Sequence, residues 1–453
     1  MPDQVKTLAL DKEHIPKLLF RYAMPAIISM TAASIYNIAD VMFIGRGVNA
    51  LAIAGLSLTL PLMNISAAFG SMIGVGASTL ISVKLGQRDM PTAEVALGNA
   101  VTLNAVIGIL YSIIALIFLK PTLLFFGASE QTLPYAREYM QIILIGNVIT
   151  HVYHGLNDNL RASGYPKKAM LATLIAVAAN LVLDPLFIFG FNWGIRGAAL
   201  ATVLAQAVAL SILLRHYSRQ DSLLHFKKGI FAIRKGMPKN IISVGLAPFL
   251  MNVVNSLVII IINRSFFEFG GDYAVGAYGI ANRMVFLFIM IMFGFNQGMQ
   301  PLVGFNYGAQ QFKRVTDIFK LTFLCAFCVS VLAFIIAQFF PEAAVSLFTN
   351  DPTLARLTVE GLHIDLSVFP LVALPLVTSN FFQAIRKPGK AIFLSLTRQV
   401  IFLIPALLIL PRFFGVTGVW ASMPVSDAAS FIVAAILITK QMKEFRKHYE
   451  LKG

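Results

Sequence analysis

The chain has 453 residues, of which 57% are hydrophobic and 13% are charged, and its formal net charge is +15. A soluble globular protein of this composition would have too little polar surface to face water, so that class is excluded. Apolar runs recur along the whole chain, and each is long enough to cross about 30 Å of hydrocarbon as a helix of roughly 20 residues. The composition therefore indicates an all-α protein that crosses the lipid bilayer several times.

The basic residues and the two cysteines point to no further function class. Lys and Arg are scattered between apolar runs and are not gathered on one folded face, so the positive charge does not indicate nucleic-acid binding. Cys325 and Cys328 form a CxxC pair inside a continuous apolar run with no His nearby. We expect them to pack as small apolar side chains and not to bind a metal.

Charged and Pro/Gly clusters divide the apolar runs into twelve predicted spans. The first six lie near residues 18–44, 51–83, 92–119, 133–160, 168–190 and 195–215. The second six lie near residues 238–263, 274–305, 315–340, 357–384, 390–411 and 416–439. Boundaries of this kind carry errors of about two to four residues.

The distribution of positive charge predicts the orientation. Roughly three quarters of the 36 Lys and Arg residues fall at the termini and in the even-numbered connections, and cytoplasmic loops are the ones that retain them. The opposite side carries Arg46, Lys120, Arg137, Arg196, Arg264, Arg356 and Arg412. We therefore predict a multi-pass protein of the inner or plasma membrane with both termini in the cytoplasm.

The two halves of the chain are predicted to be copies of one unit. A single shift of the sequence aligns Gly76 with Gly298 and Gly86 with Gly308, and it also aligns Pro166 with Pro388. Because each copy has six spans, both run in the same direction, as in parallel repeats that rock around a central cavity. The predicted parts are an N-lobe at residues 1–216, a cytoplasmic linker at 217–237 and a C-lobe at 238–453.

Two acids inside predicted spans are the strongest site candidates. An ionisable group costs about 2.5 to 3.5 kcal/mol in a bilayer on insertion scales, so Asp40 and Asp184 suggest a function. Tyr36 and Asn37 share the helical face of Asp40, and Asn180 lies one turn before Asp184. Both acids are predicted in the outer half of the N-lobe at similar depth.

The pair suits a coupling ion. Two carboxylates in one desolvated pocket raise each other's proton affinity, so one of them can bind H+ near neutral pH. The same carboxylates, with Asn180 and Thr202, also suit Na+, and this alternative stays open. A purely structural role, in which each acid caps or bonds a neighbouring helix, is the competing interpretation.

The predicted cavity residues are a wider polar set. They are Tyr36, Asn37, Asn157, Tyr139 and Asp427. Asp427 has no matching acid in the first half, and His151 and His154 are weaker candidates for proton relay than for polar packing. Asp365, Glu138 and Glu130 are expected at solvated outer rims.

Several motifs together resemble one transporter family. The stretch from Met24-Pro25 to Tyr36-Asn37-Ile38-Ala39-Asp40 is similar to the first helix of the multidrug and toxic compound extrusion (MATE) family. Further resemblance lies at Gly74 to Gln87, at Arg161 to Pro166, and at Pro301 to Gly308. The similarity covers essentially the whole chain, and the branch that it most resembles is the DinF and MepA branch.

That resemblance implies a fold and an activity. The fold is a pair of pseudo-symmetric six-helix lobes of the MOP superfamily, and the activity is efflux of cationic drugs against H+ or Na+. It also implies that acids matching Asp40 and Asp184, beside Asn180 and Thr202, carry the coupling ion, and that the first helix bends at Pro25. The second-lobe acids of the NorM branch have no counterpart at Leu250 to Val253 or Ala373 to Leu376.

The leading prediction is therefore a monomeric antiporter of small organic cations that needs no cofactor. The alternative is a flippase of lipid-linked precursors in the same superfamily, which should show a strongly cationic cavity. Only Arg283 and Arg398 are clear intramembrane cations here, so export is favoured. No HExxH or nucleophile motif indicates an enzyme.

Overall fold

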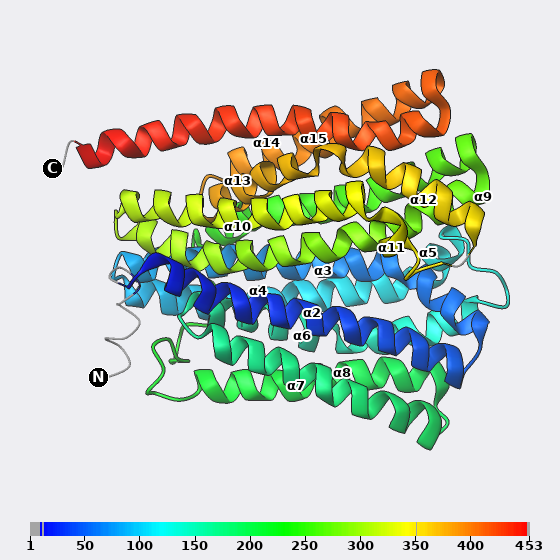
Figure 1. Cartoon of the computed structure of the whole chain (residues 1–453). Coiled ribbons are helices and arrows are strands. Elements are labelled where there is room, and N and C mark those ends of the chain that lie inside the picture. Colours follow the sequence, from blue (N-terminus) through cyan, green and yellow to red (C-terminus); the bar gives the residue numbers. More distant parts are fainter. Residues whose placement is uncertain (1–9, 11–12, 350, 451–453) are drawn as a thin grey trace. The chain divides into compact units, whose positions relative to one another are not determined.

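The computed structural model describes Leu10 and residues 13–349 and 351–450, and all regular structure in these residues is helical (Figure 1). The helices of the first half are α2 (Ile15–Gly47), α3 (Ala50–Gly86), α4 (Met90–Ile117), α5 (Leu119–Phe125), α6 (Leu133–Ala162), α7 (Pro166–Pro185), η2 (Leu186–Gly190) and α8 (Gly194–Tyr217). Those of the second half are α9 (Met237–Gly308), α10 (Phe312–Phe339), α11 (Pro341–Val345), α12 (Pro352–Asp365), η3 (Leu366–Val372), α13 (Ala373–Ala384), α14 (Pro388–Leu396), η4 (Thr397–Leu403) and α15 (Ile404–Glu450). The predicted all-α class is confirmed.

Nine helices in the described residues are long and apolar enough to cross a membrane. Two of these are pairs of spans joined at a kink, because α9 breaks at Gly271 and α15 breaks at Gly415. Both glycines have positive φ, which costs other residues steric strain. Separating the pairs, and adding the polar helix α6, gives the twelve predicted spans within a few residues of their predicted positions.

Helix α6 is not among the nine apolar helices because it carries many polar side chains. Among its buried residues are Asn147, His151, Asn157 and Asn159. Buried polar groups need partners on neighbouring helices. The helix packs against α3, α4, α7 and α8, so it lies at the centre of their contacts.

The described chain divides into two compact units. Unit 1 contains Met24–Phe249, and unit 2 contains Glu13–Ala23 with the described residues from Leu250 onward. The division thus cuts α2 next to Pro25 and cuts α9 after its first turns. The predicted lobe limits at 216 and 238 remain a prediction, and residues 1–9, 11–12, 350 and 451–453, which include the predicted cytoplasmic ends, lie outside the described part.

The glycines aligned by the repeat occupy equivalent contacts. A Cβ on Gly76 would lie 2.1 Å from the carbonyl oxygen of Ile241, in the first turns of α9 within unit 1. A Cβ on Gly298 would lie 2.7 Å from the backbone nitrogen of Ala23, in the first turns of α2 within unit 2. The repeat is therefore present in the packing, and small residues allow the close helix approach that was expected.

Candidate functional site

Asp40 on α2 and Asp184 on α7 are in contact inside unit 1. Asp40 is 7% exposed and Asp184 is fully buried. The two carboxyl groups lie close enough to interact directly. Two ionised carboxylates side by side repel each other, so the pair favours a bound proton or another cation.

Asn180 joins this pair to the next helix. Its amide Nδ2 donates to Asp184 Oδ1 at 3.2 Å and to Thr202 Oγ1 on α8 at 3.4 Å. The Thr202 hydroxyl also interacts with Tyr139 on α6, a residue that is 2% exposed. Helices α2, α6, α7 and α8 therefore supply one connected polar cluster.

The cluster has spare acceptors. Asp40 Oδ1, Asp184 Oδ2 and Asn180 Oδ1 are buried and have no hydrogen-bond partner. Buried oxygens without partners are costly, so they favour binding of a proton, a water molecule or a cation. Oxygen ligands alone suit hard cations such as Na+, and this donor set fits either coupling ion.

The backbone of α7 changes form directly after Asp184. Pro185 has no N–H, and the next five residues, Leu186–Gly190, form a π-helical turn. Such turns widen a helix locally and are frequent at functional sites. The missing N–H of Pro185 interrupts the regular α-helical hydrogen bonds at this point.

Tyr36 and Asn37 have different surroundings although they are adjacent on α2. Tyr36 interacts electrostatically with both Asp40 and Asp184, and more weakly with Tyr153. Asn37 is exposed, and its side chain donates to the carbonyl of Ala33 in its own helix at 2.9 Å. Tyr36 thus borders the acid pair, whereas Asn37 stands apart from it.

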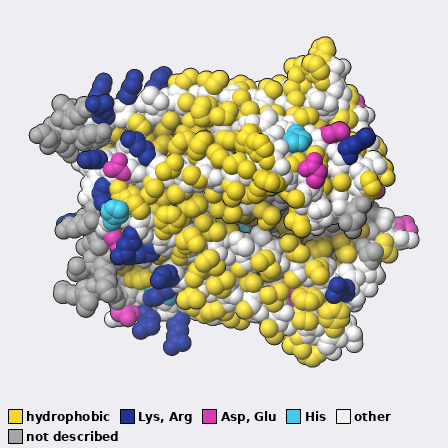
Figure 2. Space-filling model, viewed as in Figure 1, with side chains coloured by type: hydrophobic (Ala, Val, Ile, Leu, Met, Phe, Trp, Pro, Cys, Tyr) yellow, Lys and Arg dark blue, Asp and Glu magenta, His cyan; other side chains and the backbone are white. Residues whose placement is uncertain are grey.

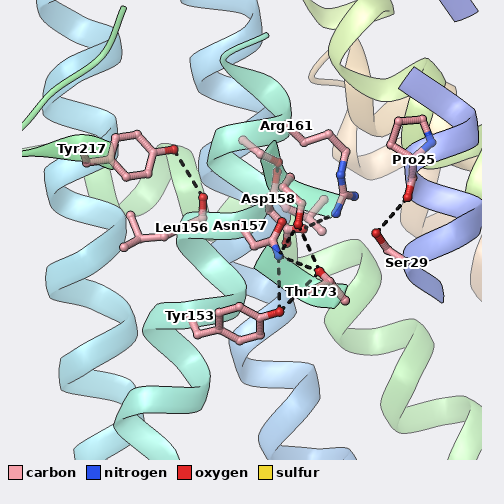
Figure 3. Close-up of polar contacts among 12 residues, drawn as sticks. Pro25, Ser29, Tyr153, Leu156, Asn157, Asp158, Arg161, Thr173 and Tyr217 are labelled. Atoms are coloured by element: carbon pink, nitrogen blue, oxygen red, sulfur yellow. Dashed lines mark hydrogen bonds and ion pairs between the residues drawn. The ribbon is translucent and has the colours of Figure 1, made fainter. Parts of the chain in front are cut away.

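Asn157 belongs to a second polar group on α6 and α7 (Figure 3). Its Nδ2 donates to Thr173 Oγ1 at 3.0 Å and to the carbonyl of Ala169 at 3.3 Å. Tyr153 Oη donates to the same Thr173 hydroxyl at 3.4 Å. The structure therefore places Asn157 in a polar contact between α6 and α7.

Asp158 and Pro25, also drawn in Figure 3, make local contacts. Asp158 forms an ion pair with Arg161 on its own helix at 3.7 Å. The Pro25 carbonyl accepts a hydrogen bond from Ser29 Oγ at 2.8 Å, and α2 stays helical through this proline. The bending of the first helix at Pro25 remains a prediction.

Asp427 lies in unit 2 and is neutralised there. Arg398 Nε donates to Asp427 Oδ1 at 2.6 Å, and the acid side chain is only 4% exposed. Asp365 is half-buried and interacts electrostatically with both. The charge of Asp427 is therefore paired with Arg398. Asp365 was expected at a solvated rim, and it lies beside this ion pair.

A polar network that the sequence analysis did not predict joins α3 and α6. Ser66 Oγ donates to Asn147 Oδ1 at 2.7 Å and lies 3.0 Å from His151 Nε2. The tautomer of His151 decides whether its Nε2 donates to the serine or accepts from it. In the sequence, Ser66, Asn147 and His151 are visible only as polar residues within predicted spans, and no pattern indicates that they contact one another.

Comparisons with known proteins agree on family and fold. A family model described as MatE matches residues 25–186 and 247–408. The multidrug export protein MepA of Staphylococcus haemolyticus is 27% identical over 428 residues, which are 94% of each chain. MepA of Staphylococcus aureus strain MRSA252 is 25% identical with the same coverage.

Solved structures share the fold at lower sequence identity. One described as MATE in the bent conformation has a TM-score of 0.92, with 24% identity and coverage of 98% of this chain and 99% of that chain. Another, a MOP superfamily transporter from Pyrococcus furiosus whose description refers to reverse polarity of its binding pocket, has a TM-score of 0.91 and 23% identity, with coverage of 97% and 99%.

Proposed function

Since the chain belongs to the MatE family of multi-pass membrane transporters, we propose that it exports small organic cations in exchange for inward-moving H+ or Na+. The family membership confirms the recognition made from motifs and the prediction that the chain is not an enzyme. The export activity is inferred from the MepA relatives together with the buried acid pair.

The contact between Asp40 and Asp184 is the observation that carries the proposal. Negative charge in a low-dielectric site attracts a cation strongly, and two acids in contact cannot both stay ionised without one. A proton on one acid would let it donate to the other, and Na+ would be held by the three unpartnered oxygens of Asp40, Asp184 and Asn180. We favour H+ because the carboxyl groups contact each other directly.

Exchange follows from the competition between two kinds of cation for the same charge. Binding of H+ or Na+ from outside neutralises the pair and removes its attraction for an organic cation. Release of the small ion to the cytoplasm restores the charge, so cargo binds again from that side. Alternation of access between the two sides then gives antiport.

The same proposal includes a plasma-membrane location, cytoplasmic termini and a monomeric state. The orientation rests on the distribution of Lys and Arg along the chain. Organic cations are the expected substrates because the intramembrane charge of unit 1 is acidic.

A lipid-precursor flippase remains the alternative function. The fold does not discriminate, because the Pyrococcus furiosus neighbour is described by its reversed pocket polarity and is as similar as the others. The sign of the buried charge does discriminate. Asp40 and Asp184 favour a cation, and the positive charge of Arg398 is matched by Asp427.

Dye efflux from proteoliposomes under an imposed pH gradient or an imposed Na+ gradient tests the proposal. Asp40→Asn and Asp184→Asn should each abolish gradient-driven efflux of an ethidium-like cation, because neither variant cycles its charge. Asp272→Asn is the matched control, since this acid is exposed next to the kink at Gly271. Full efflux by both site variants would refute coupling at this pair.

A further inference from the structure

The connection between α8 and α9 is held against α4 within unit 1. Asn99 of α4 is completely buried. Its Nδ2 donates to the carbonyls of Ile230 and Ala232, both at 3.0 Å, and its Oδ1 accepts the N–H of Arg234 at 3.1 Å. One side chain thus satisfies three backbone groups of the connection.

Three further residues of α4 fix the same segment. Thr102 Oγ1 donates to the Phe231 carbonyl at 2.8 Å, and Glu94 pairs with Lys227 at 2.6 Å. Gly98 leaves room for the backbone, since a Cβ there would lie 2.4 Å from the Ile230 carbonyl oxygen. Residues 227–234 are therefore a fixed strap and not a loose linker.

The strap reaches the level of the lipid chains. Helix α4 has 28 residues, so it is about 42 Å long at about 1.5 Å per residue. That length exceeds the roughly 30 Å hydrocarbon core by about 12 Å, or about 6 Å at each end. Asn99 and Thr102 lie about 14 and 18 Å from the start of α4, so for a helix centred on the bilayer and perpendicular to it the strap tip lies inside the edge of the hydrocarbon.

This depth explains the buried asparagine. Backbone groups at the hydrocarbon edge have no water to bond, so each needs a protein partner. Asn99 and Thr102 supply those partners to Ile230, Phe231, Ala232 and Arg234.

The outward face of the strap is apolar at its tip. Phe231 is 41% exposed and Ile233 is 53% exposed, whereas Ile230 is 5% exposed and faces α4. Exposed aromatic and branched apolar side chains at the membrane interface insert among acyl chains. These two side chains fit lipid better than water.

Basic side chains flank the apolar tip. Lys228, Arg234 and Lys235 are exposed, and within the described residues none of these three side chains has a hydrogen bond or ion pair. Figure 2 shows most of the Lys and Arg side chains of this face toward the left edge of the view, and hydrophobic side chains over its middle. Three unpaired cations beside an inserted apolar tip match an anionic lipid headgroup.

We propose that residues 228–235 form a docking surface for anionic phospholipid in the leaflet at this end of α4, which is the cytoplasmic leaflet in the proposed topology. Phe231 and Ile233 contact the acyl chains, and Lys228, Arg234 and Lys235 contact the headgroup phosphates. A free phosphate would explain the charges but not the two exposed apolar side chains, so the lipid is the partner.

Lipid quenching of a reporter at the tip tests the surface in the full-length protein. Phe231→Trp is reconstituted with acyl-brominated phosphatidylglycerol or acyl-brominated phosphatidylcholine, and the background from Trp193 and Trp420 is subtracted with the parent chain. We expect strong quenching by both lipids when each is used alone. In mixed bilayers at equal fractions, brominated phosphatidylglycerol should quench more strongly.

Charge removal then tests the headgroup contact. Each basic residue near an anionic surface contributes about a fivefold gain in affinity. Lys228→Gln/Arg234→Gln/Lys235→Gln should therefore bring the two lipids to equal quenching. The matched control removes three exposed lysines from α15, as Lys440→Gln/Lys443→Gln/Lys447→Gln, and should keep the preference.

Three outcomes would overturn the proposal. If neither brominated lipid quenches the Phe231→Trp reporter, the tip does not contact acyl chains. Equal quenching of Phe231→Trp by the two lipids in mixed bilayers would mean that the charges beside the tip do not select the lipid. The same conclusion would follow if the preference for phosphatidylglycerol persisted after Lys228, Arg234 and Lys235 were replaced by Gln. None of these readouts requires transport, so their failure would leave the proposed export function standing.

Discussion

Replacing Arg398 by methionine should destabilise unit 2 strongly. Arg398 Nε bonds Asp427 at 2.6 Å, and Asp427 is 4% exposed, so the variant leaves a carboxylate buried without its partner. Removing one member of a buried ion pair costs about 3–5 kcal/mol. Asp365 interacts with both groups, so the loss of the cation also leaves two acids facing each other.

The predicted cost is measurable as a thermal shift in detergent. For a unit of this size, about 1 kcal/mol corresponds to about 2–4 °C, so Arg398→Met should lower the apparent Tm by about 6–20 °C. All variants are melted at one scan rate, because membrane proteins commonly unfold irreversibly. Fluorescence-detected size exclusion after heating gives the remaining monodisperse fraction.

A double variant separates charge from packing. Arg398→Met/Asp427→Leu replaces both charges by apolar groups, and such replacement of a buried pair is often neutral or stabilising. It should therefore recover most of the loss of the single variant. A single variant that melts with the parent, or a double variant no better than the single one, would show that this ion pair does not stabilise unit 2.

Three smaller effects are expected elsewhere. Asp89 caps α4, and hydrogen bonding from Thr92 followed by Lys84 lowers the pKa of its carboxyl. Asp89→Ala should cost about 1 kcal/mol above about pH 4, and the difference from the parent should disappear as the pH falls through the folded pKa. Gly361→Ala should cost about 1–3 kcal/mol, because a Cβ would lie 2.3 Å from the Trp420 ring. Ser66→Ala should cost about 1–3 kcal/mol by unpairing Asn147 and His151. Thermal melts of each variant, with Ser57→Ala as the exposed serine control, check all three, and unchanged melts would contradict them.

Much of the fold was predictable because lipid imposes simple rules. Only helices and closed barrels satisfy their backbone polar groups in hydrocarbon, and runs such as Val101–Leu119 are apolar without the alternation of a barrel strand, which predicts helices. The repeat was readable from landmark glycines such as Gly76 and Gly298, which are required where helices approach closely. Helix α6 is more polar than the other spans, yet the charged and Pro/Gly clusters on either side of it still placed it correctly.

The candidate site was predictable in part. Acids in apolar helices stand out by their cost, which identified Asp40 and Asp184 as candidates, and the structure brings them into contact. Neighbours on a helix were less informative. Tyr36 faces the acids and Asn37 does not, although both share a face with Asp40 within the tolerance of helical spacing.

By itself, the sequence determined that this protein is a helical membrane protein of two repeated halves with rare acids inside its spans, because insertion into lipid constrains each helix separately. Which polar groups meet was decided only by tertiary structure. The pairing of Asp427 with Arg398 and the holding of the 227–234 strap by Asn99 join residues far apart in the chain. Side chains on different helices meet only after packing fixes the register and rotation of each helix, and no local pattern encodes that geometry.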